Sequence, residues 1–147
     1  DALNDVVITS GFISRIIDIS ASVEGDSISY RADGLIASTP TGSTAYSMSA
    51  GGPIIEPDLQ CIEMTLICAH SLFSRPTVFS AERRLRLIQK TKGGESMVIN
   101  VDGELHINLH ENEYIEVFRG KHNVKFINLI GNSFHESLCR KLCRPLK

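Results

Sequence analysis

The feature that most constrains this fold is a succession of short apolar runs, rich in β-branched residues and separated by turn signals. In the first third, strands are expected at residues 6–8, 12–23, 27–30 and 35–39. In the second half they are expected at residues 62–69, 77–80, 84–90, 97–101, 105–109, 114–119 and 123–130. Residues 24–26, 92–94 and 102–103 supply turns. Short strands at this spacing predict a mainly β fold, as a β-sandwich or a closed sheet.

A different pattern interrupts the strands between residues 37 and 52, where thirteen of sixteen residues are Gly, Ala, Ser or Thr. A tight loop leads into a short helix near Ala45, which Ser43 or Thr44 can cap and which Gly-Gly-Pro at 51–53 ends. Such a loop can bring backbone N–H groups and hydroxyls close to the phosphates or sugar of a ligand. The alternative is a tight connection whose small residues serve packing alone.

The end of the chain predicts an amphipathic helix over residues 133–142. Phe134, Leu138 and Leu142 share one face and the opposite face is basic, so the apolar stripe needs a surface to cover. At the other end, the sequence starts without Met and soon enters an apolar triplet. It therefore reads as a piece of something longer.

Composition narrows the classes of function. The 147 residues suit one domain, and fifteen Lys and Arg against seventeen Asp and Glu leave a net charge of -2, which gives no strong field to attract nucleic acid. The long uncharged run over residues 35–55 is too rich in Ser, Thr, Gly and Pro for a membrane helix. Four irregularly spaced cysteines favour reduced thiols and a cytoplasmic location.

No metal site is expected from the ligand-type residues. His106 and His110 flank a predicted strand and would lie about 13 Å apart, too far for one zinc ion. Cys139 and Cys143 would be neighbours on a helix but lack two further ligands. The sequence also contains no Walker loop, no dinucleotide fingerprint and no nucleophile elbow.

Three carboxylates accompany the small-residue loop. Asp102 precedes a glycine between two alternating runs and is interpreted as a turn residue. Asp33 also precedes a glycine, but it directly leads the strand that feeds the loop. Asn4 and Asp5 put polar groups at the start of a strand. The residues alone thus indicate an all-β domain that presents one small-residue loop with nearby carboxylates.

The loop sequence carries a family resemblance. Residues 33–47 read DGLIASTPTGSTAYS, which resembles the signature of the NAD kinases. Residues 2–7, ALNDVV, resemble the Asn-Glu stretch of that family, with Asp5 in place of Glu. Residues 70–76 (HSLFSRP) and 128–130 (NLI), the latter followed by a helix, are also similar to family segments. The resemblance extends over nearly the whole chain.

The resemblance implies that residues 1–147 form the C-terminal NAD-binding β domain of an NAD kinase. The family transfers the γ-phosphoryl of ATP, or in some members polyphosphate, to the 2′-hydroxyl of the adenosine ribose of NAD, which gives NADP. Its N-terminal α/β domain bears a Gly-Gly-Asp-Gly motif whose Asp is the expected base. Gly93-Gly94-Glu95 is not that motif. No catalytic residue and no activity are therefore expected of this chain alone.

The same resemblance implies the partners of the complete enzyme. Mg²⁺ or another divalent metal is expected with ATP, and NAD is the substrate. The last fifteen or so residues should pack back on the N-terminal domain. A homodimer or homotetramer with a shared site is expected.

Motif by motif, the resemblance also implies a site. On the adenosine side it comprises Asn4, Asp5, Thr44, Ala45, Tyr46 and Ser49. Asp5 would bind the ribose hydroxyls, because a carboxylate accepts two hydrogen bonds from a vicinal diol. Tyr46 would stack on a base, Thr44 would supply a hydroxyl, and Ser49 would reach the adenine.

On the nicotinamide side, Asp33 would bind the amide, in this family often across a subunit interface. Arg31 and His106 are further candidates there. Two other functions are considered: the second domain of a diacylglycerol-type lipid kinase, and a non-catalytic dinucleotide-binding module. The lipid kinase is disfavoured because the sequence has no evident apolar lipid-binding stretch.

Overall fold

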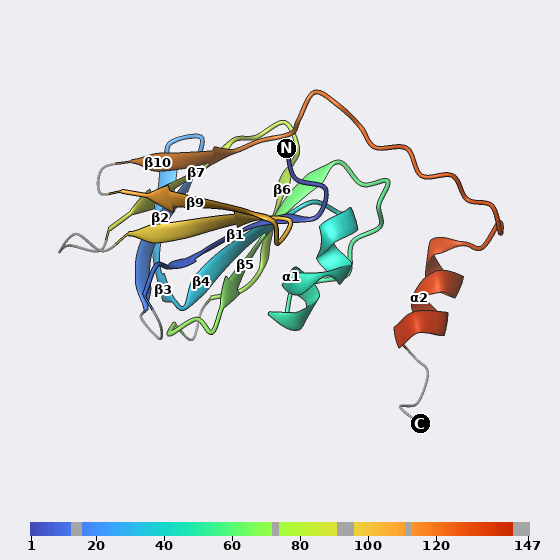
Figure 1. Ribbon diagram of the computed structural model, residues 1–147, viewed down its shortest axis with the longest axis horizontal. Helices are drawn as coiled ribbons and strands as arrows, with labels where there is room; N and C mark the ends of the chain where they lie inside the picture. Colours follow the sequence, from blue (N-terminus) through green and yellow to red (C-terminus); the bar gives the residue numbers. More distant parts are fainter. Residues whose placement is uncertain (13–15, 72–73, 91–95, 111–112, 143–147) are drawn as a thin grey trace.

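The computed structural model describes residues 1–147 except 13–15, 72–73, 91–95, 111–112 and 143–147. Its main body consists of two antiparallel sheets, with helices confined to the loop region and to the end of the chain (Figure 1). The predicted mainly β, sandwich-like class is therefore confirmed. The turn predicted at residues 92–94 lies outside the described residues, as do Cys143 and part of the segment at residues 70–76.

The larger sheet has six strands, and it carries both ends of the loop region. Its order is β6 (Thr77–Ser80), β5 (Cys61–Ile67), β4 (Gly34–Ser38), β1 (Asp5–Ser10), β8 (Met97–Val101) and β9 (Leu105–Leu109). Strand β1 lies between β4 and β8, with Asp5 opposite Ser38 and Val6 opposite Val101. This register brings the start of β1 to the end of β4, where the small-residue loop begins.

The smaller sheet has four strands in the order β10 (Tyr114–Val117), β7 (Leu85–Gln89), β2 (Ile17–Val23) and β3 (Asp26–Ala32). The β2–β3 hairpin turns at Glu24 and Gly25, both with positive φ, as the turn signal at 24–26 predicted. Alternate side chains of both sheets form one core, which includes Ile8, Leu35, Met64, Leu87 and Met97. Burial of these side chains from both sheets stabilises the pair of layers.

The loop after β4 contains the predicted short helix, but the helix begins differently from the prediction. A 3₁₀ turn, η1 (Thr41–Thr44), comes first, and the helix α1 (Tyr46–Ser49) has only four residues. Neither has a side-chain cap, so the predicted capping by Ser43 or Thr44 is wrong. Both hydroxyls instead donate to carbonyl oxygens three residues back, of Pro40 and Thr41. Gly51, with φ of 91°, follows the end of α1 as predicted.

The strand predicted at residues 123–130 is also wrong. This segment pairs with no strand in the described structure, and its apolar side chains are exposed, Ile127 at 84% and Leu129 at 89%. Apolar residues there raised the strand signal, but a strand also needs a neighbouring edge. The helix α2 (Phe134–Leu142) follows and stands apart from the sheets in Figure 1. A reciprocal pair of hydrogen bonds between Ser133 and Glu136 caps it.

Candidate functional site

Asn4 and Asp5 are held in place by a carboxylate that lies 98 and 97 residues further along the chain. Asp102 accepts hydrogen bonds from the backbone N–H groups of Leu3, Asn4 and Asp5, at 2.6, 2.7 and 3.0 Å. Asp102 occupies the β8–β9 turn with φ of 50°, next to Gly103 at 77°, so the predicted turn is confirmed. Its second role was not predicted. Three oriented N–H groups on one carboxylate fix the backbone that carries Asn4 and Asp5.

The small-residue loop holds the same backbone from its other side. Thr39 donates its N–H to the carbonyl oxygen of Asn4 at 2.9 Å and its hydroxyl to that of Leu3 at 2.7 Å. Gly42 packs so closely on Asn4 that a Cβ at this position would overlap the Asn4 carbonyl. Glycine is therefore required at position 42 for close approach. The structure thus brings Asn4, Asp5 and the loop together, as the sequence predicted.

The two carboxylates of this region differ in electrostatic environment. Asp5 is buried, at 7% exposure, and its pKa is raised by burial and by the nearby negative charge of Asp102. For Asp102, burial raises the pKa, but the hydrogen bonds from the backbone N–H groups of Leu3, Asn4 and Asp5 lower it, and the net pKa is lowered. No hydrogen bond to the Asp5 carboxylate is found among the described residues. It is left able to accept hydrogen bonds from a ligand.

A cavity of about 630 Å³ opens beside this region. Asn4, Asp5 and the loop from Ser38 to Thr41 line one part of it, and side chains of both sheets, including Ile99 and Val117, line another. Such a mixture of apolar walls with a few polar groups is typical of ligand pockets.

Four predicted residues lie between the end of η1 and the end of α1. Thr44 and Ala45 are half-buried, whereas Tyr46 and Ser49 are exposed on the outer side of α1. None of the four lines the cavity. They follow Gly42 directly along the chain, so their placement depends on how the loop and α1 are held.

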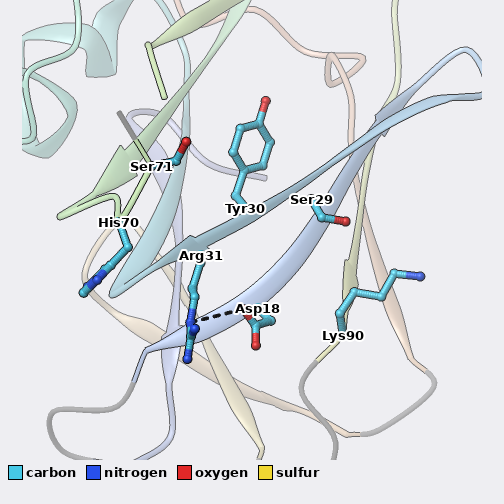
Figure 2. Close-up of a pocket in the computed structure, with 7 residues that line it drawn as sticks. All are labelled: Asp18, Ser29, Tyr30, Arg31, His70, Ser71 and Lys90. Carbon is cyan, nitrogen blue, oxygen red and sulfur yellow. Dashed lines mark ion pairs between the residues drawn. The ribbon is translucent and has the colours of Figure 1, made fainter. Parts of the chain in front are cut away.

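Two of the other predicted residues, Asp33 and Arg31, lie at the far end of β4. Asp33 precedes Gly34, whereas Asp5 pairs with Ser38, so about 17 Å of extended strand separates the two groups. The Asp33 carboxylate is 3.9 Å from the His70 ring, and the His70 N–H donates to the Arg31 carbonyl. Figure 2 shows Arg31 reaching Asp18 on the neighbouring strand, at 3.7 Å. Arg31 and His70 help to line a second cavity of about 680 Å³.

His106 belongs to neither group. It lies on β9, exposed, with its ring nitrogen 3.2 Å from the side-chain nitrogen of Asn100 on β8. Nothing else in the described structure links it to the residues named above.

Two further findings concern ions and membranes. Among the residues that the structure describes, no three His, Cys, Asp or Glu side chains gather as ligands, so these residues do not fit a divalent metal by themselves. Over the same residues, no helix combines the length and apolar character needed to span a bilayer.

Sequence reasoning missed one more cluster, in the sheet beneath α1. The side chain of Glu63 on β5 is completely buried and accepts hydrogen bonds from Ser38, Ser47 and Thr65. The sequence offered one signal for this cluster, namely a single acidic residue, Glu63, within the apolar run of β5. A carboxylate that is buried with such a strand needs hydrogen-bond donors from neighbouring side chains.

Comparison with known proteins identifies the family. A family model described as the ATP-NAD kinase C-terminal domain matches residues 3–129. The chain belongs to this family. The resemblance noted in the sequence is therefore confirmed.

Relatives with the same domain give the same result. The chain is 41% identical over 141 residues to the NAD kinase of Citrifermentans bemidjiense, covering 95% of this chain and 49% of the relative. It is 43% identical over 143 residues to that of Geobacter metallireducens, covering 95% and 50%. The chain thus spans about half the length of these relatives.

Solved structures agree with the fold. An NAD kinase from Archaeoglobus fulgidus in complex with ATP superimposes with a TM-score of 0.74 at 30% identity, covering 82% of this chain and 46% of that one. Yeast NADH kinase complexed with NADH gives 0.73 at 33% identity, covering 80% and 34%. This ATP-NAD kinase C-terminal domain therefore has the fold of kinases that bind adenine nucleotides.

Proposed function

We propose that this domain binds NAD and holds the 2′-hydroxyl of its adenosine ribose for phosphorylation by ATP or polyphosphate, giving NADP. The observation that carries the proposal is the arrangement at the start of β1. A buried carboxylate, Asp5, is without a hydrogen-bond partner among the described residues, and its backbone is held by Asp102. A ribose diol would supply the two donors that this carboxylate lacks.

The division of work between the two halves of the protein follows from phosphoryl transfer itself. The reaction needs a positioned acceptor, a cradle for the donor phosphates, a base and charge neutralisation. This domain positions the acceptor through Asn4, Asp5 and the residues of η1 and α1. The other half supplies the remainder, including the Gly-Gly-Asp-Gly base and the site where Mg²⁺ accompanies ATP. This domain alone is therefore inactive, and the complete protein works in the cytoplasm.

The separation of Asp33 from Asp5 supports a site shared between subunits. Asp5 sits at one end of β4 and Asp33 at the other, about 17 Å away. We infer that Asp33, with Arg31 beside it, reaches the nicotinamide amide of an NAD held mainly by a second copy of the chain. We therefore propose that the complete protein is a homodimer or homotetramer.

The exposed apolar segment after β10 supports contact with the other half of the protein. Val124, Phe126 and Ile127 are more than half exposed, and no residue of α2 is buried. We infer that residues 123–142 pack against the other half, since large contiguous apolar surfaces are covered in working assemblies.

The test uses the complete protein and measures NADP formation. Asp5→Ala should raise the KM for NAD about 5- to 150-fold, the effect of losing a charge-assisted hydrogen bond worth about 1–3 kcal/mol. Asp26→Ala, which removes an exposed carboxylate at the β2–β3 hairpin, is the matched control and should leave KM unchanged. An unchanged KM in the Asp5 variant would overturn the assignment.

A further inference from the structure

A helix of four residues cannot hold its own position. Isolated helices shorter than about 12 residues are marginal in water, and α1 has neither a side-chain cap nor an acidic residue in its first turn. Ser47 is its one buried residue. Whatever contacts Ser47 therefore decides where Tyr46 and Ser49 lie.

The shorter of two side-chain contacts of Ser47 is to a carboxyl group in the sheet below; the other is to the Thr65 hydroxyl at 3.1 Å. The Ser47 hydroxyl donates to Oε1 of Glu63 at 2.6 Å, and Thr65 donates to the same oxygen at 2.8 Å. The other oxygen, Oε2, accepts from Ser38 at 2.8 Å. Glu63 thus joins three segments, namely β5, the end of β4 and α1.

Gly52 closes this cluster from above. A Cβ at position 52 would overlap both Glu63 Oε1 and the Ser47 hydroxyl, and would lie 2.9 Å from that of Thr65. The Gly52 N–H also donates to the Ser47 carbonyl at 2.9 Å. The glycine that the sequence indicated as a helix stop is therefore also required by the buried carboxyl beneath it.

The same cluster reaches the Asn4 side of the site through one residue. Ser38 immediately precedes Thr39, whose N–H and hydroxyl bind the carbonyls of Asn4 and Leu3. The buried side chain of Glu63 is therefore linked to both groups on the adenosine side, Asn4 with Asp5 and Tyr46 with Ser49.

We propose that Glu63 is a positioning residue for NAD binding, which fixes α1 against the sheet through Ser47 and so sets Tyr46 and Ser49 relative to Asn4 and Asp5. Glu63 itself touches no ligand, because its side chain is completely buried. The link to NAD depends on the proposed function, whereas the anchoring of α1 does not.

The chain offers a matched pair of variants. Ser47→Ala removes the hydrogen bond that ties α1 to Glu63. Thr65→Val removes a hydrogen bond to the same oxygen and the longer contact, 3.1 Å, between the Thr65 and Ser47 hydroxyls. It leaves the 2.6 Å hydrogen bond from Ser47 to Glu63, so α1 stays tied to the carboxyl. In the complete protein, Ser47→Ala should raise the KM for NAD about tenfold, with kcat within about twofold of wild type. Thr65→Val should change neither by more than about twofold.

Variants of Glu63 test the carboxyl directly. Glu63→Gln keeps the side-chain volume, and the Ser38 hydroxyl can rotate to accept from the new amide, so KM should stay close to wild type. Glu63→Leu leaves three hydroxyls without this acceptor and should raise KM at least as much as Ser47→Ala. If Glu63→Leu does not fold, the comparison of Ser47→Ala with Thr65→Val still tests the positioning role.

Amide hydrogen exchange separates this proposal from the proposed function. Without NAD, Ser47→Ala should lose protection at the amides of residues 50–52, while Thr65→Val keeps it. Equal effects of the two variants on KM, or unchanged exchange in Ser47→Ala, would overturn the positioning role. Absence of NADP formation by the wild-type protein would overturn the proposed function instead, and exchange alone would then decide whether Glu63 anchors α1.

Discussion

The two ends of β4 are built differently. At the Ser38 end, Asp102 accepts hydrogen bonds from the backbone of Asn4 and Asp5, and Thr39 donates one to the Asn4 carbonyl. Gly42 packs closely on Asn4, and a buried carboxyl accepts a hydrogen bond from Ser38. At the Asp33 end, the side-chain contacts that involve Arg31 and Asp33 are half-exposed ion pairs at 3.7 and 3.9 Å. Buried, oriented hydrogen bonds fix geometry, whereas exposed ion pairs contribute little. One end is organised within a single chain, and the other is arranged as a surface that a second molecule can complete.

The strongest test of this difference is Gly42→Ala. Because the new Cβ would overlap the backbone of Asn4, the loop or the start of β1 must move, at a cost of about 3 kcal/mol in the free energy of unfolding. NAD binding should be lost as well. Thermal denaturation followed by circular dichroism measures the first effect. Gly120→Ala is the control, since its Cβ would meet only ordinary contacts. Equal stability of the two variants would mean that Gly42 does not pack on Asn4.

Asp102→Asn should have the next largest effect on the free energy of unfolding. Asn also adopts positive φ, so the turn survives, but its amide nitrogen cannot accept the N–H of Leu3. We expect a loss of about 1–2 kcal/mol at pH 7. The lowered pKa means that the Asp102 carboxylate stabilises the fold above pH 3.8, and that this contribution disappears as the pH falls through the lowered value.

The pH dependence can be checked by urea unfolding across the acidic range. The difference between wild type and Asp102→Asn should be largest near pH 7 and should shrink on acidification. Glu104→Gln, an exposed change in the same turn, should show no such difference. A difference that does not depend on pH would contradict the charge-assisted role of Asp102.

Asp5→Asn should act in the opposite direction on stability. Burial and Asp102 raise the pKa of Asp5, so its charge disfavours the folded state at neutral pH. Removing the charge should stabilise the protein by about 0.5–2 kcal/mol at pH 7, and this gain should fade as Asp5 itself is protonated at lower pH. NAD affinity, measured by calorimetry, should nevertheless fall. A variant that is less stable than wild type would show that Asp5 serves the fold rather than a ligand.

The smallest effect on stability is expected at the other end of β4. Arg31→Ala breaks an ion pair with Asp18 whose side chains are 67% and 49% exposed. The free energy of unfolding should therefore change by less than about 0.5 kcal/mol. The effect of Arg31→Ala on NAD binding should instead depend on protein concentration, because we propose that a second subunit completes this end. Sedimentation of the complete protein with and without NAD would test this, and a large loss of stability in the variant would contradict it.

Much of the sandwich could be predicted because the information is local. Turn residues that favour positive φ, together with alternating apolar runs, predicted most of the strands. The small-residue loop predicted where one end of the site lies. The strand predicted at residues 123–130 was wrong because strand pairing is not local information. These residues have strand-like composition, but pairing depends on a free sheet edge that no local pattern reveals.

The support of the site could not be predicted, because it depends on register between distant segments. Asp102 meets Leu3, Asn4 and Asp5 across 97 to 99 residues of sequence, only because β8 pairs with β1. The turn alone was enough to explain why an Asp stands at position 102, because Asp tolerates positive φ. Nothing in the local sequence therefore indicated its second role. Glu63 likewise meets Ser47 only after the loop folds over β5.

The central claim is that the Ser38 end of β4 holds the adenosine of NAD. The most direct measurement is a crystal structure of the complete protein with NAD. We expect the ribose hydroxyls within hydrogen-bond distance of the Asp5 carboxylate and the adenine beside Tyr46, with Asp33 at the nicotinamide of an NAD bound by a second copy. An adenosine bound away from Asn4 and Asp5, with their backbone still held by Asp102, would contradict the account.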